Sequence, residues 1–194
     1  MAKLNWFEKR AVLSRINRRM SATAAREMIL GLNVPEKPAV LEVGCGPASA
    51  LFEAISLLNP DRAVGLDIDE EMLAAAREEA ATRGYFPDFV EAKIEEIPFE
   101  DSSFDLVICF EVLHHAEDWR KAVEEIARVL KPGGHLLSRE AISPVRFRWL
   151  AWFLHGIPTD FTRANYLDHC ANSKLSCEES RVSFIHAEAI FVRE

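Results

Sequence analysis

A turn rich in small residues is the first part of this chain whose residue types could do chemistry. It runs Glu42-Val-Gly-Cys-Gly-Pro-Ala48, and its glycines would let the backbone approach a ligand closely. The N–H groups that begin a following helix would point at the same ligand. A carboxylate at Glu42 would repel a pyrophosphate but can pair with an ammonium group. The turn therefore predicts a cofactor site that favours a cationic ligand.

A second carboxylate, Asp67, directly follows the apolar run 63–66. Its two oxygens can accept hydrogen bonds from the two hydroxyls of a ribose, and a hydrogen bond to a charged group contributes about 1.5 to 3 kcal/mol. A dinucleotide-binding turn would need Gly or Ala where this chain has Ser49. Ser49 and Glu42 thus argue against a nicotinamide-dependent oxidoreductase, although Asp67 by itself would suit that cofactor too.

Short apolar strands and amphipathic helices alternate around these residues, which is typical of an α/β fold with a parallel sheet. Predicted strands are 39–43, 63–66, near 89–90, 104–110 and 135–138. Asp69 is expected to cap a helix that ends at Gly84. Residues 131–134 are expected to turn the chain into the fifth strand, and 174–184 with 187–192 to form a final hairpin.

The composition is that of one globular domain, with 194 residues, 49% hydrophobic and 28% charged. Residues 1–34 read as two helices, so we expect an N-terminal helical arm or lid there and a single domain over 35–194. The arm is rich in Lys and Arg. Such a run is usually a solvated helix face, and the alternative is attraction to an anionic substrate or to a membrane surface.

The charge and the cysteines limit the partners. A net charge of -8 disfavours nucleic-acid binding, which depends on clustered Lys and Arg, so we expect a small-molecule substrate. Four cysteines without a CxxC pair and the lack of an apolar leader predict a cytoplasmic protein with reduced thiols. No apolar run reaches the roughly 20 residues of a spanning helix. Cys170 and Cys177 with His169 lack zinc-site spacing, so we expect buried thiols and no metal.

Six segments resemble successive motifs of the class I S-adenosylmethionine-dependent methyltransferases that act on small molecules. The resemblance is closest to the group that contains quinone-biosynthesis methyltransferases, and it covers about residues 38–140, roughly half of the chain. The segments are Val40-Leu-Glu-Val-Gly-Cys-Gly46, Gly65-Leu-Asp-Ile-Asp69, Ile97-Pro-Phe99, Ser103-Phe-Asp-Leu-Val107, Val112-Leu-His-His115 and Arg128-Val-Leu-Lys-Pro-Gly-Gly134.

This resemblance implies a Rossmann-like three-layer sandwich whose mostly parallel, seven-stranded sheet has an antiparallel last strand. S-adenosylmethionine would lie across the carboxyl ends of the first strands. The implied cofactor-binding residues are Glu42, Gly44, Cys45 and Gly46 on the methionine side, Asp67 at the ribose, Ile68 at the adenine face and the carbonyl of Phe110 at the ammonium.

Two positions depart from the family pattern. Ala48 stands where a third glycine is common, and Lys93 stands where an aspartate usually reads the adenine amine. Because an ammonium group offers no acceptor, backbone groups near Ile94 or the carboxylate of Glu95 are expected to serve instead.

Candidates for the chemistry and for the acceptor pocket each have a structural alternative. His114 and His115 could include a general base, or they pack and cap the end of a strand. Aromatic residues expected at the acceptor are Trp6, Phe147, Trp149 and Trp152; aromatics at such spacing also build ordinary cores.

The expected reaction is direct displacement at the sulfonium methyl, which needs mainly alignment. The expected acceptor is a small, partly hydrophobic molecule, with peripheral membrane contact left open. The first alternative is a non-catalytic protein that binds S-adenosylmethionine or S-adenosylhomocysteine in a degenerate site. A nicotinamide-dependent oxidoreductase is the second, less favoured alternative.

Overall fold

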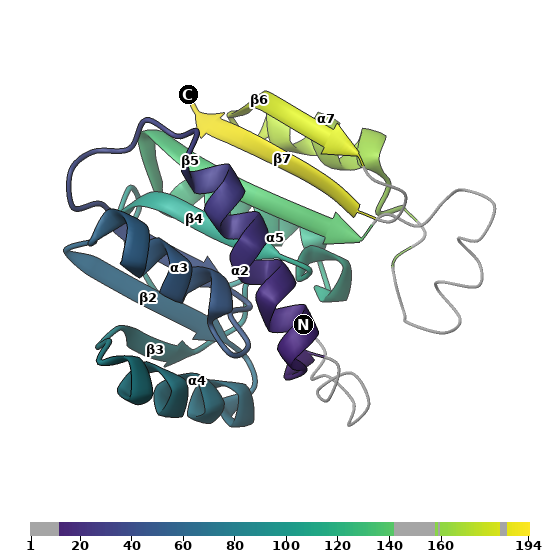
Figure 1. The fold of residues 1–194 in the computed structure, drawn as a ribbon. Coiled ribbons are helices and arrows are strands. Elements are labelled where there is room, and N and C mark those ends of the chain that lie inside the picture. Colours follow the sequence, from purple (N-terminus) through teal and green to yellow (C-terminus); the bar gives the residue numbers. More distant parts are fainter. Residues whose placement is uncertain (1–11, 142–157, 159, 183–185) are drawn as a thin grey trace.

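Seven strands form one sheet in the order β3-β2-β1-β4-β5-β7-β6 in the computed structural model of this protein (Figure 1). The structure describes residues 12–141, 158, 160–182 and 186–194. Strand β7 runs antiparallel to its neighbours β5 and β6, and the other pairs are parallel. The strands are β1 (Ala39–Val43), β2 (Arg62–Asp67), β3 (Asp88–Glu91), β4 (Phe104–Phe110), β5 (Leu130–Ala141), β6 (Leu175–Val182) and β7 (His186–Arg193). The predicted sheet and its final hairpin are confirmed.

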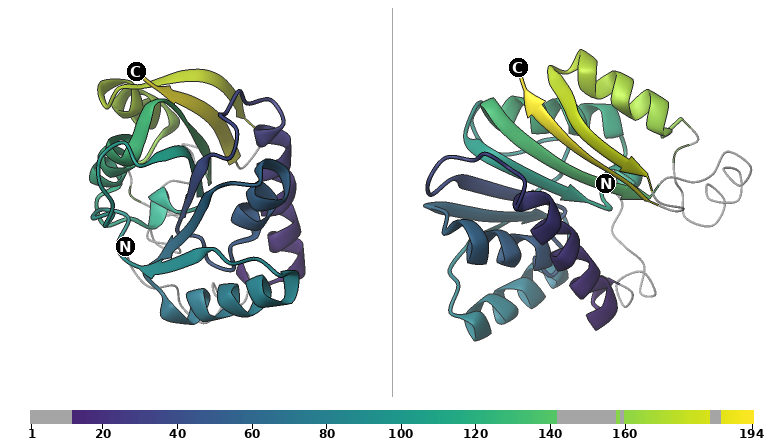
Figure 2. Two further views of the ribbon diagram at one scale, coloured as in Figure 1. Left: turned by 90° about the vertical axis from the view of Figure 1, so that its left-hand side faces the viewer. Right: turned by 45° about the horizontal axis from the view of Figure 1, so that its top comes forward.

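Helices cover both faces of the sheet, which gives the predicted three layers (Figure 2). On one face lie α2 (Arg15–Ile29), α3 (Ser49–Leu58) and α4 (Glu70–Arg83); on the other lie α5 (Trp119–Val129) and α7 (Arg163–Asn172). Each face has its own apolar cluster. Phe52 and Leu73 are buried on the first face, and Trp119, Ile126 and Tyr166 are buried on the second.

The caps of α4 follow the predicted pattern. Asp69 accepts a hydrogen bond from the backbone N–H of Glu71 at 3.1 Å, and Gly84 ends the helix with a φ of 70°. Because Asp69 begins this helix two residues after Asp67, the helix starts beside the carboxyl end of β2.

Two details differ from the sequence-based expectation. Residues 131–134 form a bulge inside β5 and not a turn before it, since Leu130 already pairs with Phe104 and His135 with Leu106. Of the two thiols expected to be buried, Cys170 is buried but Cys177 is exposed. Cys177 lies on β6, the last strand of the sheet, where every residue after the buried Leu175 is exposed.

The described part of the N-terminal segment packs on the domain. Helix α2 lies against α3 (Figure 1), and its residues Ala25 and Ile29 are only 0% and 3% exposed. Helix α2 therefore contributes to the helical layer, while a division of the chain at residue 34 stays a prediction. No helix in the described ranges is long and apolar enough to cross a membrane.

Replacement of Ile29 by Ala tests whether α2 helps to hold the fold together. Ile29→Ala should lower the free energy of unfolding by about 2 to 5 kcal/mol, because a fully buried aliphatic side chain leaves a cavity. The matched control is Leu30→Ala, since Leu30 is 66% exposed and a surface change stays within about 0.5 kcal/mol. Urea denaturation of the three proteins gives both values, and equal stabilities of all three would mean that α2 is a detachable arm.

Candidate functional site

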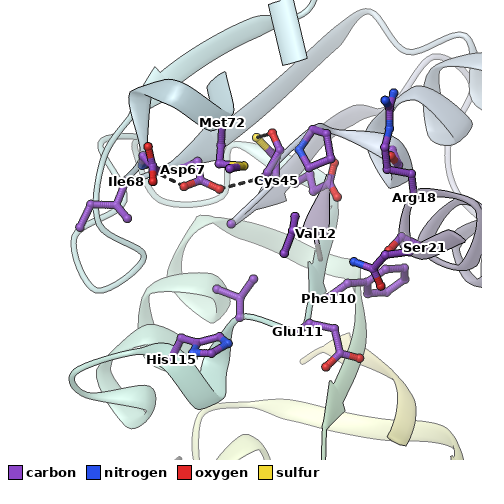
Figure 3. Close-up of a pocket in the computed structure, with 18 residues that line it drawn as sticks. Val12, Arg18, Ser21, Cys45, Asp67, Ile68, Met72, Phe110, Glu111 and His115 are labelled. Atoms are coloured by element: carbon purple, nitrogen blue, oxygen red, sulfur yellow. Dashed lines mark hydrogen bonds between the residues drawn. The ribbon is translucent and has the colours of Figure 1, made fainter. Parts of the chain in front are cut away.

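A cavity opens over the carboxyl ends of β1, β2 and β4 and is bordered by α2 (Figure 3). The glycine loop after β1 contributes Gly44, Cys45 and Gly46. Asp67 and Ile68 come from the end of β2, and Phe110 comes from the end of β4. Segments that are far apart in the sequence thus meet at one edge of the sheet, where open α/β folds place their ligands.

The loop after β1 requires glycine for two reasons. Gly44 and Gly46 adopt φ values of 60° and 49°, which residues with a Cβ atom rarely adopt. A Cβ at Gly44 would also overlap the side chain of Val112. Ala48, the position with a common third glycine in the family pattern, has a φ of 55° as well. The loop therefore keeps a glycine-like backbone at Ala48 although the residue is alanine.

Glu42, near the end of β1, also lines the cavity. Its Oε2 accepts a hydrogen bond from the backbone N–H of Leu51 at 2.9 Å, and the residue is 5% exposed. Burial, with a smaller contribution from the charge of Asp67, raises the pKa of Glu42 to about 8. A cation placed in the cavity would favour the charged form of this carboxyl group.

Asp67 connects the ends of β1 and β2. Its Oδ2 accepts a hydrogen bond from the backbone N–H of Gly46 at 2.8 Å, and its Oδ1 accepts one from Asp69 at 2.9 Å. Burial raises the pKa of Asp67. Because each carboxylate oxygen has about two lone-pair sites, Asp67 can hold the loop and still accept hydroxyl groups from a ligand.

Not every residue expected to bind the cofactor lines the cavity. Ile94 is fully buried in the apolar cluster on the α5 face and is not among the residues that line the cavity. The Nζ of Lys93 lies 3.4 Å from Glu117 Oε2, and Glu95 Oε1 accepts a hydrogen bond from the backbone N–H of Glu117 at 2.8 Å. The role of Ile94 or Glu95 in adenine recognition stays a prediction.

The two neighbouring histidines have different surroundings. They belong to the short 3-10 helix η1 (Leu113–His115). His115 lines the cavity, whereas the Nδ1 of the buried His114 lies 2.7 Å from Glu140 Oε2. Glu140 Oε1 also accepts the backbone N–H groups of Val112 and Leu113, at 3.2 and 3.1 Å. Of the pair, only His115 is among the residues that line the cavity.

Sequence reasoning missed several cavity residues. Asn17, Arg18 and Ser21 reach it from α2, and Glu111 lines it just after β4. Arg18 was recognised only as part of a basic run. The position of Glu111 at a strand end was a signal that could have identified it. The residues expected at the acceptor, Trp6, Phe147, Trp149 and Trp152, lie outside the described residues and stay predictions.

Glu42→Gln tests the burial of this carboxyl group. Because the pKa of Glu42 is raised from 4.5 to about 8, the folded protein keeps a proton that the unfolded chain releases. Glu42 therefore contributes stability that is fully present below its unfolded pKa and is lost as the pH rises through about 8. The side chain of glutamine can still accept the hydrogen bond from the backbone N–H of Leu51, and it does not titrate. Between about pH 5 and about pH 9, the melting temperature of the wild type should fall relative to that of Glu42→Gln; parallel curves would show that Glu42 is not buried as an acid.

The sequence profile of a family described as a methyltransferase domain matches residues 41–138, about half of this chain. That stretch contains Glu42, the glycine loop, Asp67 and the β4 end, which are the residues that build most of the cavity.

Curated relatives match half of the chain or more. The ubiquinone/menaquinone biosynthesis C-methyltransferase UbiE of Bartonella tribocorum is 36% identical over 127 residues, which are 61% of this chain and 48% of that protein. A phthiotriol/phenolphthiotriol dimycocerosates methyltransferase of Mycobacterium tuberculosis is 34% identical over 96 residues, 50% of this chain and 35% of that protein. The chain thus spans half or less of the length of these relatives.

Solved structures match over nearly the whole chain. A putative methyltransferase of Haloferax volcanii, in a complex with the Trm112 methyltransferase activator, has a TM-score of 0.80 at 22% identity and covers 98% of this chain and 99% of its own. An S-adenosylmethionine-dependent methyltransferase of Aquifex aeolicus has a TM-score of 0.78 at 16% identity, with coverages of 99% and 100%. At these identities the likeness concerns the fold. With the profile match over half of its length, the chain belongs to the methyltransferase domain family.

Proposed function

We propose that this protein transfers the methyl group of S-adenosylmethionine to a small, partly hydrophobic acceptor by direct displacement at the sulfonium methyl. The observation that carries the proposal is a pair of buried carboxyl groups that line one cavity together with the glycine loop. Glu42 lies near the end of β1, just before this loop, and Asp67 ends the neighbouring parallel strand β2. When bound, the cofactor supplies a methyl group on a positively charged sulfur.

The residues present fit this cofactor one by one. Gly44, whose missing Cβ keeps the loop close to Val112, and the neighbouring Cys45 and Gly46 would follow the methionine part. Glu42 would pair with the ammonium group of the methionine part, directly or through water, and the carbonyl oxygen of Phe110 would accept a hydrogen bond from the same group. A ligand that carries two positive centres would favour ionised carboxylates at Glu42 and Asp67, which would counteract the burial that raises the pKa values of both groups.

The other end of the cofactor would lie at the end of β2. Asp67 would accept the two ribose hydroxyls, and Ile68 would cover one face of the adenine. Both residues line the cavity. A pyrophosphate in the same place would meet two buried carboxyl groups and no cation from the loop, which supports S-adenosylmethionine over a dinucleotide.

We propose that residues 1–34 act as a lid over this site. The lid proposal is supported by α2, which contributes Asn17, Arg18 and Ser21 to the cavity (Figure 3). Arg18 pairs with Glu79 at 2.8 Å, and its guanidinium could also hold the carboxylate of a methionine moiety, because a planar fork of donors matches a carboxylate.

A partly hydrophobic small molecule is the acceptor best supported. The two curated relatives are named for the biosynthesis of ubiquinone or menaquinone and for dimycocerosates, and the net charge of -8 disfavours a nucleic acid. Alignment of the reactants contributes about 7 to 11 kcal/mol in well-oriented reactions. The residues around the acceptor therefore need mainly to hold it in line with the methyl group.

Asp67→Ala tests the cofactor assignment. S-adenosylmethionine and S-adenosylhomocysteine should bind to the wild type and NAD should not. Loss of the charged ribose contact should weaken both methionyl ligands by about 10- to 100-fold, which corresponds to about 1.5 to 3 kcal/mol. Isothermal titration calorimetry measures these affinities.

The matched control is Asp88→Ala, because Asp88 is an exposed aspartate at the opposite end of the neighbouring strand β3. This variant should bind as the wild type does. Unchanged affinity in Asp67→Ala, or no heat with either methionyl ligand in the wild type, would refute the assignment. Binding without turnover on a broad acceptor panel would favour the non-catalytic alternative.

A further inference from the structure

We propose that Glu111 is the general base of this methyltransferase, and that its carboxylate takes the proton of a weakly acidic hydroxyl, such as that of a phenol or an enol, as the methyl group is transferred to that oxygen. This inference rests on the proposed function of the cavity and names the class of acceptor and the residue that deprotonates it.

The backbone places Glu111 in an uncommon conformation at the site. Glu111 follows the last residue of β4 with a φ of 60°, and its N–H donates to the carbonyl oxygen of Arg139 at 2.7 Å. A residue other than glycine in this region costs of order 1 kcal/mol or more and persists where the surroundings fix it, often at functional sites. The strained residue here lines the cavity itself.

Glu111 lies on the acceptor side of the cavity. In Figure 3 it is at the end away from Asp67, with His115 at the same end. Glu42 and Asp67 are both engaged at the proposed cofactor end, and the Nδ1 of His114 is held by Glu140. Glu111 is therefore the described carboxyl group best placed to reach a molecule beside the methyl group.

Side chains from two other strands lie beside the carboxyl group of Glu111. Its Oε1 lies 3.1 Å from His186 Nε2 of β7 and 3.9 Å from Arg139 Nε of β5. Arg139 Nε lies 3.4 Å from Glu188 Oε1 of β7. The Oε1 of Glu111 is buried and makes no hydrogen bond among the described residues, but the side chain of Glu111 is 29% exposed, so part of it is open to a ligand.

The groups that face Glu111 set its protonation near neutral pH. Burial and the negative Glu140 of β5 raise the pKa of Glu111 to about 7, and the charges of His114 in η1 and Arg139 in β5 counteract this. Burial and Arg139 lower the pKa of His186, while Glu188 and Glu140 act in the other direction. A base with a pKa near the working pH transfers protons efficiently.

The proposed step balances in atoms and charge. The O–H bond of the acceptor breaks and its proton goes to the carboxylate of Glu111. The oxygen lone pair forms the new O–CH₃ bond, and the S–CH₃ bond breaks with its electron pair staying on sulfur, which becomes neutral. The products are the methyl ether, S-adenosylhomocysteine and one proton, which Glu111 releases to solvent. Arg139 and His186 act as positioning residues.

Glu111→Gln separates the base from the binding of the cofactor. The assay follows methyl transfer from labelled S-adenosylmethionine to phenol, catechol, hydroquinone and 2-naphthol, and calorimetry with S-adenosylhomocysteine runs in parallel. The variant should bind S-adenosylhomocysteine as the wild type does and lose about 10²- to 10⁴-fold in kcat/KM. In the wild type, kcat/KM should rise with pH and level off with a midpoint at about 7, and this rise should be lost in the variant.

Two further variants serve as controls. Glu179→Gln changes a glutamate of β6 whose side chain is 64% exposed and should behave as the wild type. Glu111→Asp keeps a carboxylate, and it should retain part of the activity and the pH dependence even if Glu111→Gln is poorly folded.

The outcomes separate the two proposals. No binding of S-adenosylhomocysteine to the wild type refutes the proposed function. Normal binding of S-adenosylhomocysteine together with no methylation of any of the four hydroxyl compounds overturns the role of Glu111 alone. Methylation at the same rate and with the same pH profile in the wild type and Glu111→Gln overturns it as well.

Discussion

The hydrogen bond from the backbone N–H of Gly46 to Asp67 Oδ2, 2.8 Å long, is the interaction on which the site depends. It joins the loop after β1 to the end of β2, and Asp67 Oδ1 extends the same connection to Asp69, the cap of α4. One carboxyl group thus fixes a loop, a strand end and a helix start relative to one another. Parallel pairing brings these segments to one edge of the sheet, and the carboxyl group of Asp67 sets their spacing at the cavity.

Burial gives this arrangement its chemical character. Glu42, Asp67 and Glu111 all have pKa values above the ordinary range, and burial is the largest cause for each. Placing carboxylates away from water costs free energy unless a partner compensates. A positively charged ligand would provide that compensation at Glu42 and Asp67, whereas Glu111 has Arg139 and His186 within 4 Å. The same physical effect therefore prepares one end of the cavity for a cation and the other end for a proton.

The sequence was sufficient to predict the sheet and the cofactor end of the cavity, because local patterns encode both. A strand followed by a glycine loop, and a second strand followed by Asp67, place their residues at the same edge in any parallel sheet. Even the cap at Asp69 and the helix end at Gly84 were predictable from residue type.

The features that were not predictable depend on contacts between distant segments. Glu111 could be placed at a strand end, but its residue type does not suggest its positive φ, and its N–H donates a hydrogen bond to the carbonyl oxygen of Arg139 on another strand. The bulge at 131–134 arises from how β5 pairs with β4. The sequence did not predict it because the same residues would also suit a turn. Arg18 reaches the cavity only because α2 packs on α3. The prediction that Cys177 is buried was wrong, because its strand lies at the edge of the sheet.

A crystal structure of the protein with S-adenosylhomocysteine tests the central claim most directly. The account predicts the ligand across the carboxyl ends of β1 and β2, with the ribose hydroxyls at hydrogen-bond distance from Asp67, about 2.5 to 3.0 Å, and the sulfur on the side of the cavity that leads to Glu111. A ligand bound elsewhere on the protein, or bound in this cavity with its ribose away from Asp67, would contradict it.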